Sequence, residues 1–485
     1  MTDEKFIVAL DQGTSSSRAL AVAADGTVRA MKSAPLAPSR PGDGLSEYDA
    51  QILADSQLGV LNDLLDEIGP QNAAALAVTS QRSTVVLWDR QTGRAAAPVL
   101  TWEDGRSVEE ARRAEVSQEE IHAVTGLYKT PYFSAPKIAW CLAHMPGAKE
   151  ALKAGNLLVG PVASYLIWKL TQGKTFAADP TLAQRMLLLD IRTKTWSEEL
   201  CRAFGVPSAC LPEIRPSAAD YGAYDYKGVR IPIAACAGDQ QASVAFTDLR
   251  PGQTCINYGT GAFLLHNAGA AAPVFLPGML TSLSASGADG ACDYLLEGPV
   301  NAAGSVFQWL NAQGITFDHR EIDALCGEAK NPVWFLPALG GLGAPYWDYS
   351  VTPAFAGLSP RTRRADWVAG AARGVAFLLA DIAAYLRAGG YPVSSPVRVS
   401  GGLSRISYLM RFQADLLQAE LLVAQEAEST VLGAARLTAR QIGWNAGAWK
   451  EAAAERVLPA LDGVKAADLH QRWQAFVGWC KARPS

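Results

Sequence analysis

The chain has 485 residues, enough for two large domains or about three of average size. It has 43 Lys and Arg against 47 Asp and Glu, a net charge of −4, which argues against a protein whose main task is to bind nucleic acid, because that needs a clear basic excess. Hydrophobic residues make up 49% and charged residues 19%, so the chain has a large core and is not disordered.

Neither a secretion signal nor a membrane span is expected. The polar start Met1–Lys5 leads into Phe6–Leu10, an apolar stretch too short for a signal core. No run reaches the roughly 18 apolar residues of a spanning helix. The eight cysteines include no Cys-x-x-Cys pair and stand among apolar neighbours, which predicts reduced thiols in the core. Together these features predict a cytoplasmic protein without nucleic-acid or membrane partners.

The first 30 residues predict a β-hairpin. Strands over Phe6–Leu10 and Arg18–Val22 flank the polar turn Asp11–Ser17. The pattern returns near residue 250, where strands over Thr254–Asn257 and Ala262–Leu265 flank a Gly/Thr turn. One such hairpin opens each half of the chain, which suggests a duplicated architecture.

After each hairpin, strand and helix patterns alternate, which predicts an α/β fold. Ser107 and Glu110 predict a capping box at the start of one helix. A boundary near residue 245 divides the chain into two domains, residues 1–245 and 246–485, with a cleft between them. Further strands are predicted over Ala75–Thr79, Thr84–Trp88 and Ile231–Ala237, and helices over Glu47–Leu65, Val108–Val124, Ile138–Ala154, Ala302–Leu310, Ala365–Ala388 and Ile406–Gln418.

The turn Asp11–Arg18 carries the groups that a phosphate-binding loop needs. Gly13 lets the backbone approach an anion, the hydroxyls donate hydrogen bonds, Arg18 is positive and Asp11 suits Mg²⁺. An ordinary polar turn has the same composition, and the chain has no Walker-type phosphate loop. The second turn, Tyr258–Gly261, is open to the same two interpretations. Together the two turns favour a nucleotide phosphate held between two hairpins.

Asp239 follows a predicted buried strand. Ligands of α/β proteins lie beyond the carboxyl ends of strands, where a carboxylate can accept the proton of an attacking hydroxyl. Asp is also a good helix cap, so both roles stay open. Gly401 and Gly402 suit a close approach to the base and sugar of a nucleotide. The five histidines lack metal-ligand spacing, and there is no nucleophile elbow.

In this order, these blocks resemble the FGGY family of carbohydrate kinases, and within it the glycerol kinases. The resemblance runs from Phe6 to about Trp449. The matching blocks are Ile7–Thr14, Ser80–Arg82, Pro131–Ser134, Tyr165–Gly173, Ala237–Ala242, Asn257–Gly261, Gln308–Leu310, Gly341–Asp348 and Leu432–Ala435.

The resemblance implies two actin-like (ribonuclease H-like) ATPase domains with the active site in their cleft. It implies ATP-dependent phosphorylation of a hydroxyl of a small polyol or sugar, with Mg²⁺, by a homodimer or homotetramer. Asp239 would be the general base, and Asp11 and Asp239 would position Mg²⁺. The nucleotide and its phosphates would meet Thr14, Ser15, Ser16, Arg18, Thr260, Gly261, Gly304, Gln308, Gly401 and Gly402. The acceptor would meet Arg82, Ser83, Trp102, Tyr132, Asp239, Gln240 and Phe263.

Ser83 departs from this pattern, because glycerol kinases have a Glu there that binds substrate hydroxyls. Losing such a charge-assisted hydrogen bond costs about 1.5–3 kcal/mol. The block Trp102–Arg106 is more like that of pentulose kinases, and its Glu103 and Asp104 are candidates to replace the missing carboxylate. Three functions stay open: a glycerol kinase, a kinase of a four- or five-carbon polyol or a ketopentose, and a non-catalytic sugar- or nucleotide-binding regulator.

Overall fold

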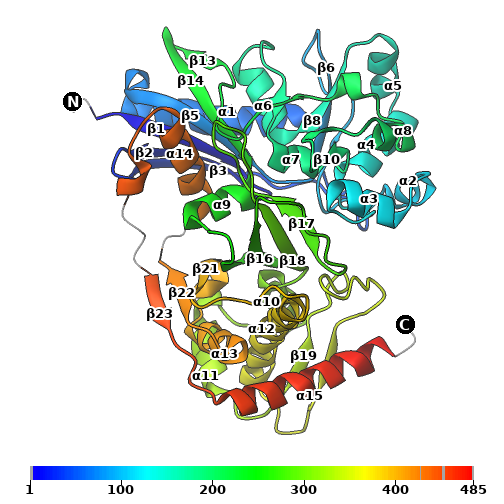
Figure 1. The fold of residues 1–485 in the computed structure, drawn as a ribbon, viewed down its shortest axis with the longest axis vertical. Helices are drawn as coiled ribbons and strands as arrows, with labels where there is room; N and C mark the ends of the chain where they lie inside the picture. The colour runs from blue at the N-terminus through cyan, green and yellow to red at the C-terminus, as the bar shows by residue number, and fades with distance from the viewer. Residues whose placement is uncertain (1–3, 426–427, 450–453, 483–485) are drawn as a thin grey trace.

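The computed structural model describes residues 4–425, 428–449 and 454–482. A β-sheet organises each half of the molecule, and α9 (Asp239–Thr247) lies between the halves (Figure 1). The first sheet runs in the order β13 (Ala223–Tyr226), β14 (Val229–Gly238), β5 (Ala73–Ser80), β1 (Phe6–Gln12), β2 (Ser16–Ala23) and β3 (Val28–Pro35). The second runs β17 (Leu280–Leu283), β18 (Tyr294–Val300), β16 (Ala262–Gly269), β15 (Thr254–Tyr258), β21 (Val397–Gly401), β22 (Leu421–Ala424) and β23 (Ala454–Val457).

The two sheets repeat one topology. In the first, the antiparallel strands β3, β2 and β1 are followed by β5 and β14, which run parallel to β1. In the second, the antiparallel strands β18, β16 and β15 are followed by the parallel strands β21 and β22. The duplicated α/β architecture predicted from the two hairpins is therefore confirmed.

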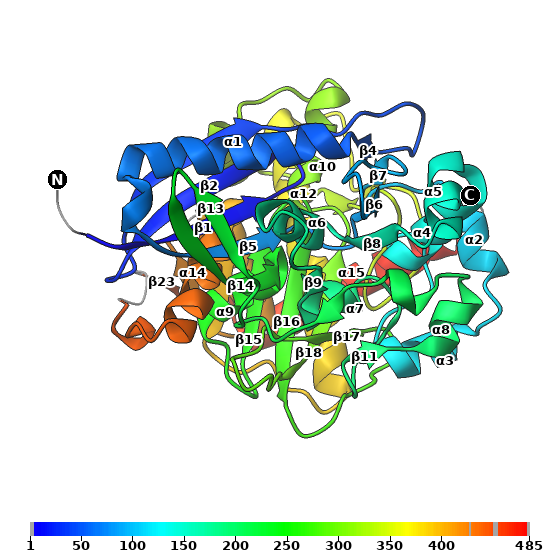
Figure 2. The same cartoon turned by 90° about the horizontal axis from the view of Figure 1, so that it is seen from above.

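Strand β1 is apolar throughout because both of its faces are covered. Phe6, Val8 and Leu10 pack in the cluster with α1 (Ala50–Ile68), while Ile7 and Ala9 pack in the cluster with α14 (Ser429–Gln441). Figure 2 shows α1 lying across the first sheet. In sequence, helix α14 lies between β22 and β23 of the second sheet, yet it covers one face of the first sheet.

Smaller sheets and further helices surround this frame. The sheets are β4 (Glu47–Tyr48), β7 (Val99–Leu100), β6 (Val85–Asp89) and β8 (Leu157–Pro161); β9 (Ala177–Ala178) with β12 (Glu213–Ile214); β10 (Leu189–Asp190) with β11 (Thr195–Trp196); and β19 (Trp334–Leu336) with β20 (Ala354–Ala356). The helices are α2 (Val108–Arg113), α3 (Gln118–Thr125), α4 (Ser134–His144), α5 (Pro146–Lys153), α6 (Val162–Leu170), α7 (Pro180–Gln184), α8 (Glu198–Ala203), α10 (Gly304–Ala312), α11 (Ile322–Glu328), α12 (Arg364–Ala388), α13 (Ser407–Leu417) and α15 (Gly463–Lys481).

Two predicted helices are wrong in length. Val108–Val124 is divided into α2 and α3, and Ile138–Ala154 into α4 and α5. Pro146 occupies the first turn of α5, and a proline there starts a new helix because it lacks the N–H that would continue the old one. Apolar periodicity runs through both breaks, which is why the pattern alone did not reveal them.

The capping box predicted at Ser107 is also wrong. Ser107 makes no capping hydrogen bond, and its buried hydroxyl has no partner. Its backbone is not extended, which an N-cap requires (φ −92°, ψ 21°). The capping box forms instead at the start of α3, between Ser117 and Glu120.

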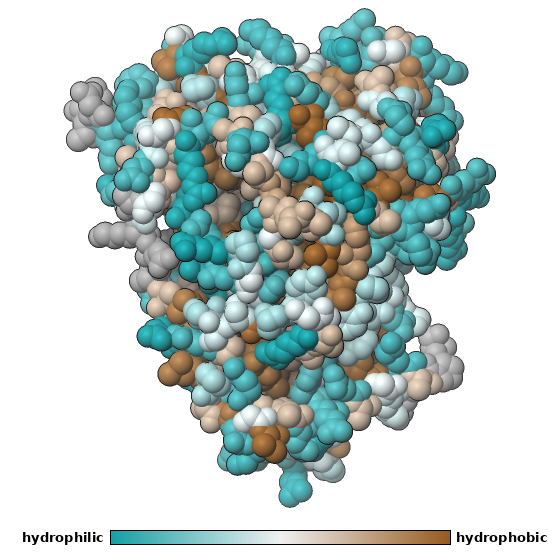
Figure 3. Space-filling model, in the orientation of Figure 1, coloured by the Kyte–Doolittle hydropathy of each residue, from teal (hydrophilic) through white to brown (hydrophobic). Residues whose placement is uncertain are grey.

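The eight cysteines are free and buried, as predicted. Helix α12 is long and apolar enough to cross a membrane, but 83% of its most apolar window is buried inside the protein. It therefore serves as the central helix of the second half's core. On the face shown in Figure 3, hydrophilic groups cover most of the surface and hydrophobic groups are dispersed among them.

Helix α9 packs closely on α14, and this contact depends on Gly433. A Cβ atom added at Gly433 would lie 1.8 Å from the carbonyl oxygen of Ala242 on α9. No side chain fits there, so the two helix backbones touch directly. Because Asp239 begins α9, this contact also fixes where Asp239 lies.

We expect Gly433→Ala to destabilise the protein by about 1–3 kcal/mol, the usual cost of overpacking. Gly59→Ala is the matched control, because Gly59 is exposed on α1 and no atom lies within 4 Å of an added Cβ. Alanine should raise helix stability there by about 0.5–1 kcal/mol. Urea unfolding of both variants checks this. Equal effects at the two sites would contradict the backbone contact.

Candidate functional site

Three parallel strands of the first sheet end side by side. The pairing places Gln12 of β1 opposite Ser80 of β5, and Ser80 opposite Gly238 of β14. The residues at or just beyond these ends are Asp11, Arg82 and Asp239. The carboxyl ends of parallel strands are where α/β proteins bind ligands, so this edge forms the base of the site.

Arg82 links the two halves of the molecule at this base. Its guanidinium lies 3.5 Å from the carboxylate of Asp239 and 3.3 Å from that of Glu297, on β18 of the second sheet. It also lies over the ring of Phe263, 5.5 Å from the centroid. Arg185 pairs with Glu297 from the other side at 2.5 Å. Arg82, Glu297 and Arg185 are all buried, and we call these three residues the arginine–glutamate cluster.

The arginine–glutamate cluster keeps its glutamate ionised. Burial alone raises the pKa of Glu297, but the charges of Arg185 and Arg82 outweigh it and lower that pKa to about 2. Ser282 adds a hydrogen bond to the same carboxylate at 2.6 Å. Glu297 is therefore ionised at neutral pH.

Asp239 has the opposite shift. Burial raises its pKa to about 6; Arg82 opposes this and the nearby Asp11 reinforces it. The side chain is still 38% exposed, so a ligand can reach it. Its carboxylate also accepts the backbone N–H of Gln240, the next residue of α9. A reachable carboxylate with a pKa near neutrality suits a proton acceptor.

The first hairpin turn lies against the aromatic part of the site. The indole N–H of Trp102 donates to the hydroxyl of Thr14 at 3.0 Å. The Trp102 and Tyr132 rings are in contact, with centroids 5.6 Å apart. Ser15 is exposed and Ser16 is half-buried on the same turn. Residues predicted to bind phosphate thus lie next to residues predicted to bind the acceptor.

Arg18 is already paired with carboxylates. It contacts Asp11, and it lies 2.6 Å from Glu428, just before α14. The other oxygen of Asp11 accepts from Thr79 at 3.3 Å. Asp11 and Glu428 together outweigh the single charge of Arg18, so this end of the site is not strongly positive.

The predicted nucleotide residues meet at the ends of β15 and β21, and glycine is required at several of these positions. A Cβ at Gly304 would lie 2.7 Å from the carbonyl oxygen of Gly259, and one at Gly261 would lie 2.7 Å from that of Val300. Gly401 has φ +97°. Gly402 has no atom within 4 Å of an added Cβ, so this backbone faces open space. The backbone N–H of Ser305, in the first turn of α10, donates to the carbonyl of Thr260, and Gln308 is exposed one turn later.

Ser83 is buried among the acceptor residues. It has a left-handed backbone (φ +65°), and its buried hydroxyl has no partner. The two carboxylates that were candidates to replace the glutamate are engaged elsewhere. Asp104 is buried and binds Arg106 and the backbone N–H of Ser46, and Glu103 pairs with Arg40. The expectation that they compensate for Ser83 is therefore not supported.

Several residues that shape the site carried no signal in the sequence. Glu297, Arg185 and Glu428 are single charged residues outside any motif, and they reach the site only through the fold. Lys137 is fully buried in α4, although it stands close to the recognised block Pro131–Ser134. A charged residue inside an apolar helical pattern is the only hint that sequence alone provides for Lys137.

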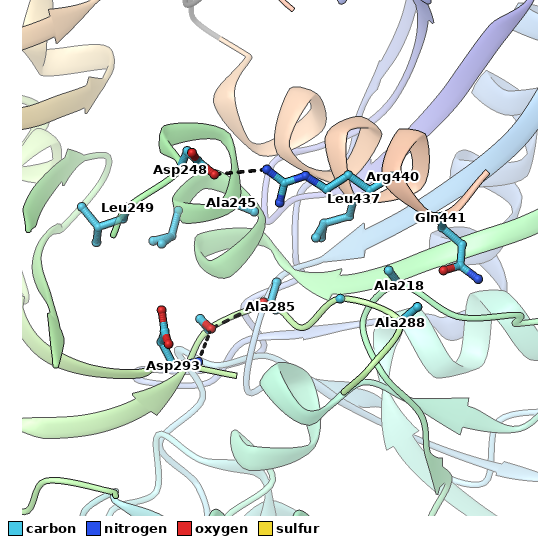
Figure 4. Close-up of a pocket in the computed structure, with 13 residues that line it drawn as sticks. Ala218, Ala245, Asp248, Leu249, Ala285, Ala288, Asp293, Leu437, Arg440 and Gln441 are labelled. Atoms are coloured by element: carbon cyan, nitrogen blue, oxygen red, sulfur yellow. Dashed lines mark hydrogen bonds and ion pairs between the residues drawn. The ribbon is translucent and has the colours of Figure 1, made fainter. Parts of the chain in front are cut away.

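A cavity of about 230 Å³ lies away from these residues, at the far end of α9 (Figure 4). Asp248 and Arg440 form an ion pair on one side of it, and Ala285 and Asp293 lie opposite. The chemistry-bearing side chains gather at the other end of α9, so this cavity is not the candidate site.

Comparison with known proteins agrees with this geometry. The FGGY family of carbohydrate kinases matches through its N-terminal domain over residues 6–245 and its C-terminal domain over residues 254–442. The glycerol kinase of Thermus brockianus is 38% identical, over 98% of this chain and 99% of its own length. The glycerol kinase of Shewanella frigidimarina is 36% identical, over 99% and 98%.

Solved structures give the same result. A glycerol kinase of Plasmodium falciparum, crystallised with ADP, superposes with a TM-score of 0.91 and 27% identity over 99% of both chains. A xylulose kinase of Brucella ovis, at 24% identity over 98% of this chain and 99% of its own, shares the fold with a TM-score of 0.86.

The chain belongs to the FGGY family of carbohydrate kinases. Its two halves are actin-like ATPase domains, as the resemblance implied. It is a glycerol kinase-like enzyme that uses ATP to phosphorylate a hydroxyl of a small polyol or sugar. Its cytoplasmic location, its oligomeric state and the domain boundary near residue 245 stay predictions.

We expect Glu297→Gln to destabilise the fold strongly. The substitution removes the carboxylate that pairs with buried Arg185 and leaves buried Arg82 with Asp239 alone, and breaking a buried ion pair in this way costs about 3–5 kcal/mol. Glu109→Gln is the control, because the Glu109–Arg112 pair is exposed and should change stability by no more than about 0.5 kcal/mol. Urea unfolding measures both. A Glu297→Gln protein as stable as the control would contradict a charge-balanced cluster.

Proposed function

We propose that Asp239 is the general base of the transfer. It would accept the proton of the acceptor hydroxyl as that oxygen attacks the γ-phosphorus of ATP in line with the departing ADP. The observation that carries the proposal is the position of Asp239 at the open end of three parallel strands, with a pKa raised to about 6. Arg82 beside it would bind acceptor hydroxyls and hold the base in place.

On the nucleotide side, we infer that the two hairpin turns share the phosphates. Thr14, Ser15 and Ser16 would donate from the first turn, and Thr260 and Gly261 from the second. The open backbone at Gly401 and Gly402, with Gly304 and Gln308 on α10, would line the rest of the nucleotide. Arg18 would move from its carboxylate partners toward a phosphate, because the several negative charges of a triphosphate compete well for a guanidinium.

Mg²⁺ would bind between the phosphates and the carboxylates of Asp11 and Asp239. Among the described residues no group of three or more Asp, Glu, His or Cys comes together. Mg²⁺ in phosphotransferases needs only one or two carboxylates beside water and phosphate oxygens. Asp11 and Asp239 are close enough for Asp11 to raise the pKa of Asp239, so they supply that pair. When bound, the ion would neutralise charge on the phosphates.

For the acceptor, glycerol is the first candidate because the full-length relatives are named glycerol kinases. Trp102, Tyr132 and Phe263 would pack on its carbon atoms, while Arg82, Asp239 and Gln240 would bind its hydroxyls. Ser83 favours a second candidate, a four- or five-carbon polyol or a ketopentose. Its short neutral side chain provides no carboxylate for glycerol, and Asp104 and Glu103 do not replace one.

The proposed base is tested by Asp239→Asn, which keeps the size and one acceptor oxygen but cannot accept the proton. We expect turnover to fall by about 10²- to 10⁴-fold, with ATP affinity changed little. In the wild type, kcat/KM should fall below an apparent pKa of about 6, because only ionised Asp239 accepts a proton. ADP release and calorimetric ATP binding measure the two effects. Near-normal turnover in the variant would refute the assignment.

Restoring the missing carboxylate separates the two acceptor classes. We expect Ser83→Glu to raise kcat/KM for glycerol about ten-fold or more, the value of one charge-assisted hydrogen bond. It should lower kcat/KM for longer acceptors that use the space. Ser83→Gln is the control, because it adds the same length without the charge. If Ser83→Glu leaves glycerol use unchanged, the missing carboxylate does not limit glycerol binding.

A further inference from the structure

Lys137 is a fully buried lysine with an unusual set of partners. It lies in the first turn of α4, and its side chain is 0% exposed. Its ammonium turns back toward the chain that precedes the helix. There it donates to the backbone carbonyls of Pro131 and Tyr132 at 2.6 Å each, with Phe133 at 3.5 Å. A protonated lysine has three N–H donors, one for each of these carbonyls.

These carbonyls belong to the segment that carries Tyr132. Its ring contacts Trp102 at 5.6 Å and Phe133 at 5.1 Å, so the ring belongs to the aromatic part of the site. Nothing in the Tyr132 side chain itself fixes the backbone that presents it. The first N–H groups of α4 donate to other backbone carbonyls, Ser134 to Arg185 and Ala135 to Met186, while Lys137 donates to the carbonyls of the segment before the helix.

We propose that Lys137 is a positioning residue for the acceptor: its buried side chain fixes the backbone of Pro131–Phe133 and so sets where the Tyr132 ring lies. The inference rests on the proposed role of Tyr132 at the acceptor. It assigns no contact between Lys137 and any substrate. Lys137 acts through Tyr132 alone.

The surroundings of Lys137 make its hydrogen bonds to these carbonyls sensitive to pH. Burial lowers the pKa of Lys137 to about 7, and the charge of Asp104 opposes the shift only in part. A neutral amine has two N–H donors and a lone pair, so it cannot serve three carbonyl oxygens. Above pH 7 the segment should loosen, and the affinity for the acceptor should fall.

Neighbouring titratable groups do not mimic this effect. On α4 itself, Cys141 has its pKa raised to about 12 by burial. Burial likewise raises the pKa of Tyr132 above the ordinary tyrosine value. Asp104, from the loop after β7, is already bound to Arg106. On the α2 side, Glu110 faces His144 at 4.0 Å, at the opposite end of α4 from Lys137.

The test compares KM for the acceptor with KM for Mg·ATP across about pH 6.5 to 9. We expect the wild-type acceptor KM to rise above pH 7 while the ATP KM does not follow it. Lys137→Met should raise the acceptor KM about ten-fold or more at pH 6.5, the scale of a small misplacement, and abolish its pH dependence. Lys137→Arg keeps a permanent charge and should restore part of the affinity, also without pH dependence.

Lys129→Met is the matched control. Lys129 also donates to two backbone carbonyls, of Ala114 and Val116 at 2.8 Å each, but these do not carry Tyr132. Its acceptor KM and pH profile should match the wild type. If Lys137→Met fails to fold, the wild-type profile still decides, and an acceptor KM that is flat across this range overturns the inference. If no acceptor is phosphorylated at all, the proposed function has failed instead.

Discussion

Arg82 links the two halves of this kinase at the base of the candidate site. It follows the central strand β5 of the first sheet, and it binds one carboxylate from each half: Asp239 at the start of α9 and Glu297 on β18. A buried guanidinium needs compensating charge, so the position of the two sheets is tied to this residue. Arg185 completes the balance by sharing Glu297. The proposed base and the proposed acceptor site are therefore built around one ion-pair cluster.

This cluster also explains how two neighbouring carboxylates differ so strongly. Glu297 lies between two arginines and has a pKa of about 2, whereas Asp239 shares one arginine, lies near Asp11 and has a pKa of about 6. The first is a fixed charge that holds the structure. The second changes its protonation near neutral pH, as a proton acceptor must. Burial raises the pKa of both groups, but Glu297 is in direct contact with two arginines and Ser282, whereas Asp239 contacts Arg82 alone and lies near the charge of Asp11.

Much of this could be predicted from sequence because the signals are local. The two hairpins, the buried strand before Asp239 and the α/β alternation all follow from patterns of a few adjacent residues. The helix break at Pro146 was missed because apolar periodicity continues through it, and the cap at Ser107 was wrong because its Ser-x-x-Glu pattern does not reveal the backbone conformation. Glu297, Arg185 and Lys137 were missed for another reason. Each depends on contacts between segments far apart in the chain or on a side chain that turns back, and neither leaves a motif.

The site at the ends of the parallel strands is proposed to join ATP to a small hydroxylated acceptor. The most direct test is acceptor-dependent ADP release with Mg·ATP and a panel of glycerol, erythritol, ribitol, arabitol, xylitol, xylulose, ribulose and dihydroxyacetone. We predict ADP formation that requires one of these acceptors and saturates with it. ADP formation that no acceptor stimulates, in protein that binds ATP, would contradict the account.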